Sequence, residues 1–280
     1  MVGRNLPWKK DLRRFGMHKL FSKIFLYCLL LCPIFVHSQS ILTDNGVPVT
    51  IFRKTISENL GTVIVAHGCY GVSDHEERIA KLFSSEGFNS IVVDSWAYRG
   101  IPKGNGPGSM CQVYAVTGEQ RLEETYKTVN WIKRQSWHSG KIFLIGFSHG
   151  GALALQASQN SLDKGIDKSV SFYPYCFPYD HREPKIPVQL HIGSSDDWTP
   201  PHRCRGIYSG WFRNYKNGEY YEYQNSTHAF DVQGLMFRCP QNGCVRRGIG
   251  EGGMVVDRVI KYNQETTTLA YERVLKFFKE

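Results

Sequence analysis

A serine flanked by glycines lies near the middle of the sequence, in the segment Gly146-Phe147-Ser148-His149-Gly150. The apolar run at residues 142–145 is typical of a strand buried on both faces, and the small residues from Gly151 onward favour a helix. A serine in such a strand–turn–helix unit is held in strained backbone with its hydroxyl above the sheet edge. The flanking glycines leave room for the adjoining backbone. The pattern predicts a nucleophilic Ser148, and an ordinary serine in a βα turn is the alternative.

A nucleophilic serine needs a histidine base, and the base needs an acid that orients it. In hydrolases with this turn, the acid and then the base follow the serine along the chain. Asp196 lies three residues after Gly193, past an expected strand, and is the preferred acid. Asp197 is the second choice because sequence fixes the register of a turn poorly, and a locally bonded turn residue is the alternative. Among ten histidines, His228 has both the required order and a position after a strand, so it is the predicted base.

The oxyanion formed during attack needs two backbone N–H donors. One is the amide of His149, directly after the nucleophile. The second is expected in the loop after an earlier strand, where residues 67–71 read His-Gly-Cys-Tyr-Gly, and we predict the amide of Cys69. A plain glycine-containing turn is one alternative. A catalytic thiol at Cys69 is another, but no histidine stands beside it in the expected arrangement, so Ser148 is preferred.

Strands and helices alternate along the chain, which predicts a mostly parallel α/β sheet with helices on both faces and a single domain over residues 39–280. An edge strand is expected at residues 47–52. Asp74 is the expected N-cap of a helix over residues 76–85. The other expected helices lie at residues 119–135, from Gly151 onward, at 201–214 and at 264–279. Further strands are expected at residues 62–66, 89–93, 142–145, 169–172, 188–192 and 219–223.

A long segment rich in Gly and Pro at residues 95–111 is expected to be a functional loop. It follows a strand, and ligands of α/β sheets bind at the carboxyl ends of the strands. We therefore predict that Trp96, Tyr98 and Arg99 line the acyl or alcohol pocket, and that Tyr70 also contacts the substrate. Arg99 would pair with a substrate carboxylate; alternatively, it holds the loop through backbone carbonyls.

The N-terminal 38 residues have the features of a secretory signal peptide. Lys19 and Lys23 precede a 13-residue apolar run, and Val36 and Ser38 suit a cut after Ser38. A start at Met17 would give a signal of ordinary length, and a membrane anchor is the alternative. Residues 1–38 hold seven of the 34 Lys/Arg and one of the 25 Asp/Glu, so the remainder carries a net charge of +3 in place of +9. The basic balance therefore does not indicate nucleic-acid binding, and an exported protein, periplasmic or secreted, is expected without stable membrane association after cleavage.

Six cysteines remain after residue 38, and an even number in an exported chain favours disulfides. Cys239 and Cys244 enclose four residues that include the turn former Asn-Gly, so we predict a bridge between them. Two free thiols are the alternative. The other four, Cys69, Cys111, Cys176 and Cys204, cannot be paired from the sequence, and Cys69 is a candidate free thiol. No spacing typical of a metal site occurs among the cysteines and histidines.

Taken together, the motifs resemble the dienelactone hydrolase family of α/β-hydrolases over residues 48–280. The matching segments are residues 67–71, 94–100 with Cys111, 146–151, 193–204, 228–230 and the closing Tyr262-Asn263 with its helix. The resemblance implies hydrolysis of esters or lactones by a nucleophile–His–Asp triad, with roles that fall on Ser148, His228 and Asp196 and on the amides of Cys69 and His149. The founding enzymes have a cysteine nucleophile and a glutamate in the oxyanion loop; here Ser148 and Gly68 stand in those places.

The expected protein is thus a serine hydrolase that cleaves small-molecule carboxylic esters or lactones through an acyl-enzyme. This mechanism requires no metal or organic cofactor. A peptidase on the same fold would carry the same triad and is one alternative. A non-catalytic binding protein with a hydrolase fold is another. The sequence does not indicate the oligomeric state or the natural substrate.

Overall fold

The computed structural model of the protein describes residues 36–54, 59–104, 108–113, 115–160, 162–177, 182–210, 217–239 and 258–280. The predicted signal peptide lies outside this part of the chain, apart from residues 36–38, which begin the first strand. A cut after Ser38 would leave residues 39–42 of that strand. Residues 36–280 form one compact unit.

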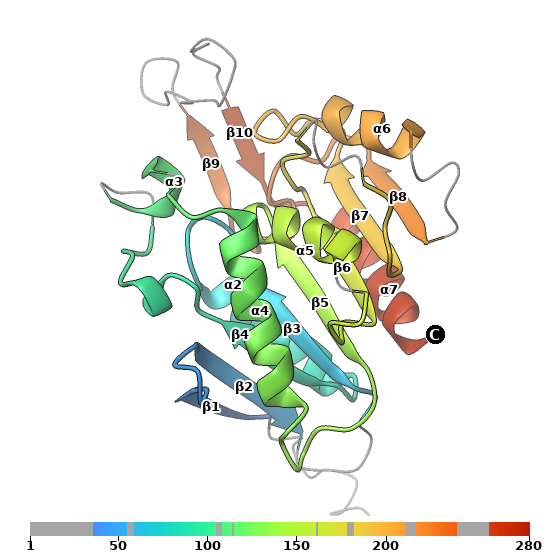
Figure 1. The fold of residues 1–280 in the computed structure, drawn as a ribbon. Helices are drawn as coiled ribbons and strands as arrows, with labels where there is room; N and C mark the ends of the chain where they lie inside the picture. Colours follow the sequence, from blue (N-terminus) through green and yellow to red (C-terminus); the bar gives the residue numbers. More distant parts are fainter. Residues whose placement is uncertain are drawn as a thin grey trace, which may run out of the picture. The chain divides into compact units, whose positions relative to one another are not determined.

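The centre of this unit is an eight-stranded sheet in the order β1-β2-β4-β3-β5-β6-β7-β8 (Figure 1). The first two strands run antiparallel to their neighbours, and all pairs from β4 to β8 are parallel. The mostly parallel α/β fold predicted from the sequence is therefore confirmed. The strands are β1 (Val36–Leu42), β2 (Pro48–Lys54), β3 (Thr62–Ala66), β4 (Asn89–Val93), β5 (Ile142–Phe147), β6 (Lys168–Phe172), β7 (Val188–Gly193) and β8 (Gly218–Tyr223).

The inner strands are apolar throughout because helices cover the sheet on both sides. Every residue of β3, β5 and β7 is buried. β8 alternates more in its exposure, as expected for a strand at the edge of the sheet. The sequence predicted β2 as an edge strand. This is wrong, because β1 pairs with β2 along its full length. β1 was not predicted, because its sequence, Val-His-Ser-Gln-Ser-Ile-Leu, is largely polar and lacks the apolar pattern of a strand.

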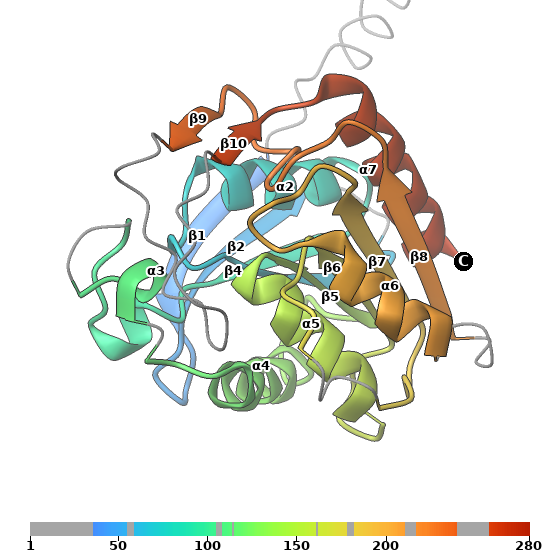
Figure 2. The same cartoon turned by 90° about the horizontal axis from the view of Figure 1, so that it is seen from above.

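Helices α4 (Gly118–Ile132) and α5 (His149–Asn160) cover one face of the sheet, and α2 (Asp74–Ser85) and α7 (Gln264–Lys279) cover the other (Figure 2). Each face has its own apolar cluster. On the α2/α7 face, the ring of Phe278 stacks on that of Phe143 in β5 with 4.6 Å between centroids. The shorter helices are η1 (Ala97–Arg99), α3 (Met110–Val113) and α6 (Pro201–Gly210).

The helix starts follow ordinary capping rules, with one correction to the prediction. Ser73, and not Asp74, is the N-cap of α2: its hydroxyl accepts from the amide of His75, and Glu76 completes a capping box. Asp74 lies one residue further on, in the first turn. Asn263 caps α7 by accepting from the amide of Thr266.

A separate antiparallel pair, β9 (Met236–Cys239) and β10 (Arg258–Lys261), lies between β8 and α7 in the sequence. These two strands were not predicted. Within the described ranges, no helix has the length and apolar character needed to cross a bilayer.

Candidate active site

The serine turn has the geometry that its glycines predict. Ser148 lies between β5 and α5 with φ +53°, a left-handed conformation that is costly for a residue with a side chain. A Cβ added at Gly146 would overlap the carbonyl oxygen of Gly150, and one added at Gly150 would overlap that of Ala66. The amide of Ser148 donates to Phe172 at the end of β6, 2.9 Å away. The tight packing of three strand ends therefore holds this turn.

Ser148, His228 and Asp196 form one continuous chain of hydrogen bonds. The Oγ of Ser148 lies 3.1 Å from Nε2 of His228, and Nδ1 of the same ring lies 2.9 Å from Oδ2 of Asp196. The three residues follow β5, β8 and β7, at the shared carboxyl edge of the sheet. The carboxylate 2.9 Å from His228 belongs to Asp196, the preferred acid.

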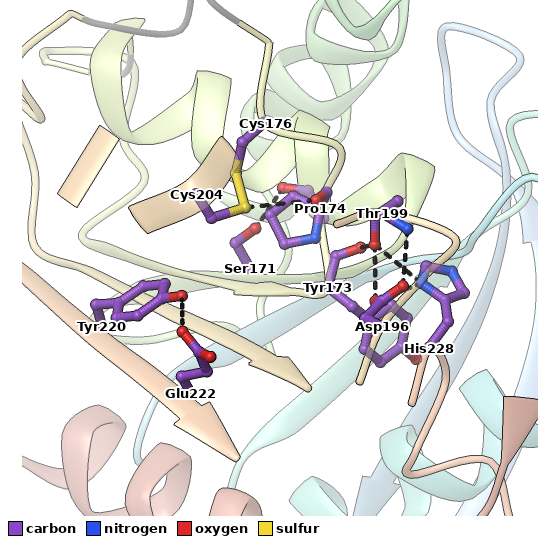
Figure 3. Close-up of a disulfide and its surroundings, with 11 residues drawn as sticks. Ser171, Tyr173, Pro174, Cys176, Asp196, Thr199, Cys204, Tyr220, Glu222 and His228 are labelled. Atoms are coloured by element: carbon purple, nitrogen blue, oxygen red, sulfur yellow. Dashed lines mark hydrogen bonds and ion pairs between the residues drawn. A yellow bond between two sulfur atoms is a disulfide. The ribbon is translucent and has the colours of Figure 1, made fainter. Parts of the chain in front are cut away.

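The acid is held by its own turn, residues 193–199. Oδ1 of Asp196 accepts from the amides of Trp198 and Thr199, at 2.9 and 2.7 Å. The hydroxyl of Thr199 lies 2.8 Å from Oδ2 of Asp196 and 3.1 Å from the carbonyl oxygen of Tyr173 (Figure 3). Since the carboxylate is buried and each oxygen has partners, its position relative to His228 is fixed.

The loop that carries His228, residues 224–230, packs directly on the acid turn. The amide of Ser195 donates to the carbonyl of Ser226, 3.0 Å away. A Cβ at Gly193 would overlap that same carbonyl oxygen, which explains the glycine at the end of β7. From the other side, the N-cap residue of α7, Asn263, donates through Nδ2 to the hydroxyl of Ser226 at 3.1 Å. The base loop is thus held between the acid turn and the last helix.

The oxyanion loop, residues 67–71, follows β3 and lies against the nucleophile. A Cβ built on Gly68 would be 3.6 Å from Cβ of Ser148 and 3.4 Å from the carbonyl oxygen of Phe147. The side chain of Cys69 is not a free thiol, contrary to the expectation from sequence, because it forms a disulfide with Cys111 at the start of α3. Its carbonyl accepts from the indole N–H of Trp96 at 3.0 Å. Cys69 is therefore fixed through both its side chain and its backbone.

Three of the four residues predicted to contact substrate have other positions. Tyr98 packs against the apolar cluster on the α4/α5 face of the sheet. Trp96 is fully buried beneath the oxyanion loop, between the rings of His67 and His149, so it does not line an open pocket. Arg99 points into the protein, where it forms an ion pair with the buried Glu124 and donates to the carbonyl of Ser95 at 3.2 Å. Tyr70 is 55% exposed at the surface of the oxyanion loop, where it remains a candidate for substrate contact.

The contacts of Arg99 favour the alternative in which it holds the loop. We expect Arg99→Ala to lower the free energy of unfolding by about 1–3 kcal/mol, since charged hydrogen bonds to a buried carboxylate are lost. The ratio of kcat/KM for neutral and acidic esters should not change. Urea denaturation and a paired set of neutral and acidic p-nitrophenyl esters measure the two quantities. A selective loss of acidic-ester hydrolysis would instead return Arg99 to the substrate pocket.

A second disulfide joins Cys176, in the segment after β6, to Cys204 in α6 (Figure 3). It links the strand end that carries Tyr173 to the helix that begins directly after the acid turn. Neither pairing could be read from the sequence, because each joins segments whose proximity depends on the fold. The predicted Cys239–Cys244 bridge lies outside the described residues at Cys244 and stays a prediction. The two disulfides are consistent with an exported protein.

The two disulfides differ in exposure, and this predicts the order of their reduction. Cys176 and Cys204 are buried, whereas Cys69 and Cys111 are partly exposed. Dithiothreitol should therefore open Cys69–Cys111 first, because thiol–disulfide exchange requires access to a sulfur atom. Its loss should lower the free energy of unfolding by about 2–4 kcal/mol. Alkylation at increasing reductant concentrations, followed by peptide mass spectrometry, gives the order; earlier alkylation of Cys176 or Cys204 would contradict it.

Behind the triad lies a buried polar cluster that the sequence analysis did not find. Asp231 is buried and accepts from the hydroxyls of Tyr173 and Tyr271, at 2.7 and 2.8 Å. Nε2 of His75, in α2, lies 3.4 Å from the same carboxylate. Tyr173 also packs its ring edge-on against His228, with 4.7 Å between centroids. The cluster therefore contacts the base through the ring of Tyr173.

Charges in this cluster shift the pKa values of its members. Burial alone would raise the pKa of Asp231, but His75 and the two tyrosine hydroxyls lower it overall. Burial alone would lower the pKa of His75, but the Asp231 carboxylate raises it. Burial and the same carboxylate raise the pKa of Tyr173 well above its usual range. The two tyrosines are therefore neutral donors to Asp231, and the charged forms of His75 and Asp231 favour each other. Within the described residues, no group of three or more His, Cys, Asp or Glu is placed to hold a metal ion.

Comparison with known families gives a match over most of the chain. The sequence model of the dienelactone hydrolase family matches residues 48–280. The chain belongs to the dienelactone hydrolase family. This confirms the resemblance noted from the motifs, and it supports hydrolase activity in general terms. Comparison with curated proteins gives no match.

Solved structures with the same fold include other dienelactone hydrolase-like proteins. One is a putative dienelactone hydrolase from Klebsiella pneumoniae, with TM-score 0.69, 17% identity, and coverage of 88% of this chain and 99% of that one. Another is the dienelactone hydrolase-like promiscuous phosphotriesterase P91 from metagenomic libraries, with TM-score 0.62, 15% identity, and coverage of 87% and 97%. A Pyrococcus furiosus esterase gives TM-score 0.55 at 18% identity, with coverage of 71% and 87%. At these identities, the likeness to the three structures shows a shared fold and no more.

Proposed function

We propose that the protein is a serine hydrolase that cleaves small-molecule carboxylic esters or lactones. The observation that carries the proposal is the chain of hydrogen bonds from Ser148 through His228 to Asp196, at 3.1 and 2.9 Å, on a strained serine turn. Nucleophile, base and acid have the mutual geometry that acyl transfer requires.

In the proposed reaction, Oγ of Ser148 attacks the ester carbonyl carbon while Nε2 of His228 accepts the hydroxyl proton. The amides of Cys69 and His149 stabilise the oxyanion that forms as the carbonyl π bond breaks. The proton on His228 then passes to the leaving alkoxide, and the acyl group stays on Ser148. A water molecule, deprotonated by His228, attacks the acyl-enzyme and releases the acid. Asp196 holds the proton of His228 on Nδ1 throughout and stabilises the imidazolium.

The departures from the founding family members affect the expected substrate. Ser148 replaces a cysteine, and the room beside it at Gly68 is not filled by a carboxylate side chain. We therefore expect ordinary esters and lactones rather than dienelactone itself. An exported location, through a signal peptide that ends at Ser38, is part of the same proposal.

The test is an activity panel on the protein from residue 39 onward. Hydrolysis of p-nitrophenyl esters of varied acyl length, together with labelling of Ser148 by a fluorophosphonate probe, is the expected result. Labelling should disappear in Ser148→Ala. An aminoacyl anilide tests the peptidase alternative, and a phosphotriester belongs on the panel because one structural neighbour is a phosphotriesterase. If the folded protein shows neither turnover nor labelling, the proposal is refuted and a non-catalytic binding role is supported.

A further inference from the structure

Arg121 is a fully buried arginine that none of the sequence motifs includes. It lies in the first turns of α4 and is 1% exposed. A guanidinium removed from water needs partners for its five N–H donors, because burial of an unpaired charge is costly. Its partners therefore indicate why the charge is there.

Those partners belong to the two segments that form the proposed oxyanion site. Nη2 of Arg121 donates to the carbonyl oxygen of His67, in the oxyanion loop, at 3.0 Å. Nη1 donates to Nδ1 of His149, the residue after the nucleophile, at 2.9 Å. Nε lies 3.2 Å from the hydroxyl of Ser95 and donates to it. One rigid group thus connects the oxyanion loop to the nucleophile turn.

The hydrogen bonds of His149 fix its protonation state. Its Nε2 donates to the carbonyl of Val116 at 3.0 Å, so Nδ1 is free to accept from Arg121. Burial and the Arg121 charge lower the pKa of His149 to about 3, which keeps the ring neutral at physiological pH. Its backbone amide, one of the two proposed oxyanion donors, is therefore tied to Arg121 through a ring with a single orientation.

A second route connects Arg121 to the other proposed donor. Its guanidinium lies over the ring of Trp96, 4.8 Å from the centroid, and the indole N–H of Trp96 donates to the carbonyl of Cys69. Trp96 thus holds the Cys69 carbonyl, which follows the donor amide along the chain, and Arg121 directly holds the His67 carbonyl, which precedes it. The guanidinium therefore supports the backbone on both sides of the Cys69 amide, once directly and once through Trp96.

The surrounding charges keep Arg121 protonated. Burial lowers its pKa to about 10, and the carboxylate of Glu124, one turn further along α4, opposes this shift. Glu124 also pairs with Arg99. A lysine could not replace Arg121 in this role, because an ammonium group is a point charge without the planar fork that reaches three acceptors in fixed directions.

We propose that Arg121 is a positioning residue that sets the spacing of the Cys69 and His149 amides around the oxyanion. The inference rests on the proposed function, since it assumes that these amides stabilise the transition state. Loss of one oxyanion donor typically lowers kcat by about 10²- to 10³-fold, and misplacement of donors that remain present should cost less, about 10- to 100-fold. Binding of the uncharged ground state should be unaffected.

The test compares Arg121→Lys and the charge-neutral double variant Arg121→Met/Glu124→Gln with wild type. We expect kcat/KM for a p-nitrophenyl ester to fall about 10- to 100-fold in both. The Ki of an alkyl trifluoromethyl ketone, which takes up the serine oxygen to form an anionic hemiketal, should rise in parallel. The Ki of the matching alcohol, a ground-state ligand, should stay unchanged. A merely structural role would not separate the two inhibitors.

The matched control is Arg134→Met. Arg134 lies just after the same helix and forms an exposed ion pair with Asp44, a residue outside the proposed oxyanion site. It should keep wild-type kinetics. Folded Arg121 variants with wild-type kcat/KM and ketone affinity would overturn the inference. If neither variant folds, His149→Phe and Trp96→Phe each remove one link without changing a charge, and wild-type kinetics in both would overturn it as well.

A double-mutant cycle identifies the route. If Arg121 acts through the His149 ring, the loss caused by Arg121→Met/Glu124→Gln should be smaller in a His149→Phe background. Additive losses would contradict that route. The wild-type protein separates the two proposals: absence of Ser148-dependent ester hydrolysis refutes the proposed function, whereas active wild type with fully active Arg121 variants refutes the inference alone.

Discussion

Ser148→Ala and His228→Ala should each lower kcat/KM for a p-nitrophenyl ester by about 10⁴- to 10⁶-fold, because the triad acts as a unit. Asp196→Asn should cost about 10³- to 10⁴-fold, since an amide no longer favours the proton on Nδ1 of His228. The geometric reason is the single run of hydrogen bonds through the three side chains. Steady-state kinetics on the purified variants measure the losses, and circular dichroism checks that each remains folded.

Asp197→Asn is the matched control for the acid. It makes the same chemical change one residue further along the same turn, at the carboxylate that was the second choice for the acid. We expect kinetics within a few-fold of wild type. Full activity in Asp196→Asn with a large loss in Asp197→Asn would move the acid by one residue, and full activity in Ser148→Ala would refute the serine mechanism.

Asp231→Ala should be among the most destabilising single substitutions in the protein, with a loss of about 3–5 kcal/mol in the free energy of unfolding. Removing one partner of a buried ion pair leaves the other charge without compensation. Here the change also leaves the buried hydroxyls of Tyr173 and Tyr271 without their acceptor. Urea denaturation at neutral pH measures the loss. Asp44→Asn, in an exposed ion pair with Arg134, is the control and should change stability by about 0–1 kcal/mol.

The same measurement has an expected pH dependence. The pKa of Asp231 is lowered in the folded state, so its contribution is present above the ordinary value of 3.8 and is lost as the pH falls through the lower folded value. The pKa of His75 is raised, so its contribution is present below the ordinary value of 6.5 and is lost as the pH rises through the higher folded value. The difference between wild type and Asp231→Ala should therefore be greatest between these limits. A difference that grows steadily toward strong acid would contradict the ion pair.

The parts of the site that sequence predicts well are those fixed by local rules. The serine turn depends on glycines within a few residues of Ser148, and the acid and base each follow a strand at a short, characteristic distance. The family match and the sheet order bear out the fold that those signals predict. The strands at residues 62–66 and 89–93 also agree with the structure, because runs buried on both faces have few other interpretations.

Long-range contacts explain what the sequence did not show. Arg121 and Asp231 are charged residues in otherwise ordinary segments, and their partners lie on other elements of the fold. Trp96 and Arg99 follow a strand end, as ligand-binding residues often do, but the direction of a side chain in a long loop depends on tertiary packing. Cys69 pairs with Cys111 across 42 residues, a distance along the chain that no spacing rule covers.

The position of α7 affects when the site can assemble during synthesis. Phe278 packs on Phe143 beneath the strand that leads to Ser148, while Asn263 and Tyr271 hold the base loop and Asp231. The serine turn is therefore translated about 130 residues before the helix that completes its surroundings. At about 5–20 residues per second, the delay is on the order of ten seconds. A nascent chain consequently carries its nucleophile without an ordered base, and hydrolysis should begin only once residues 263–278 have left the ribosome.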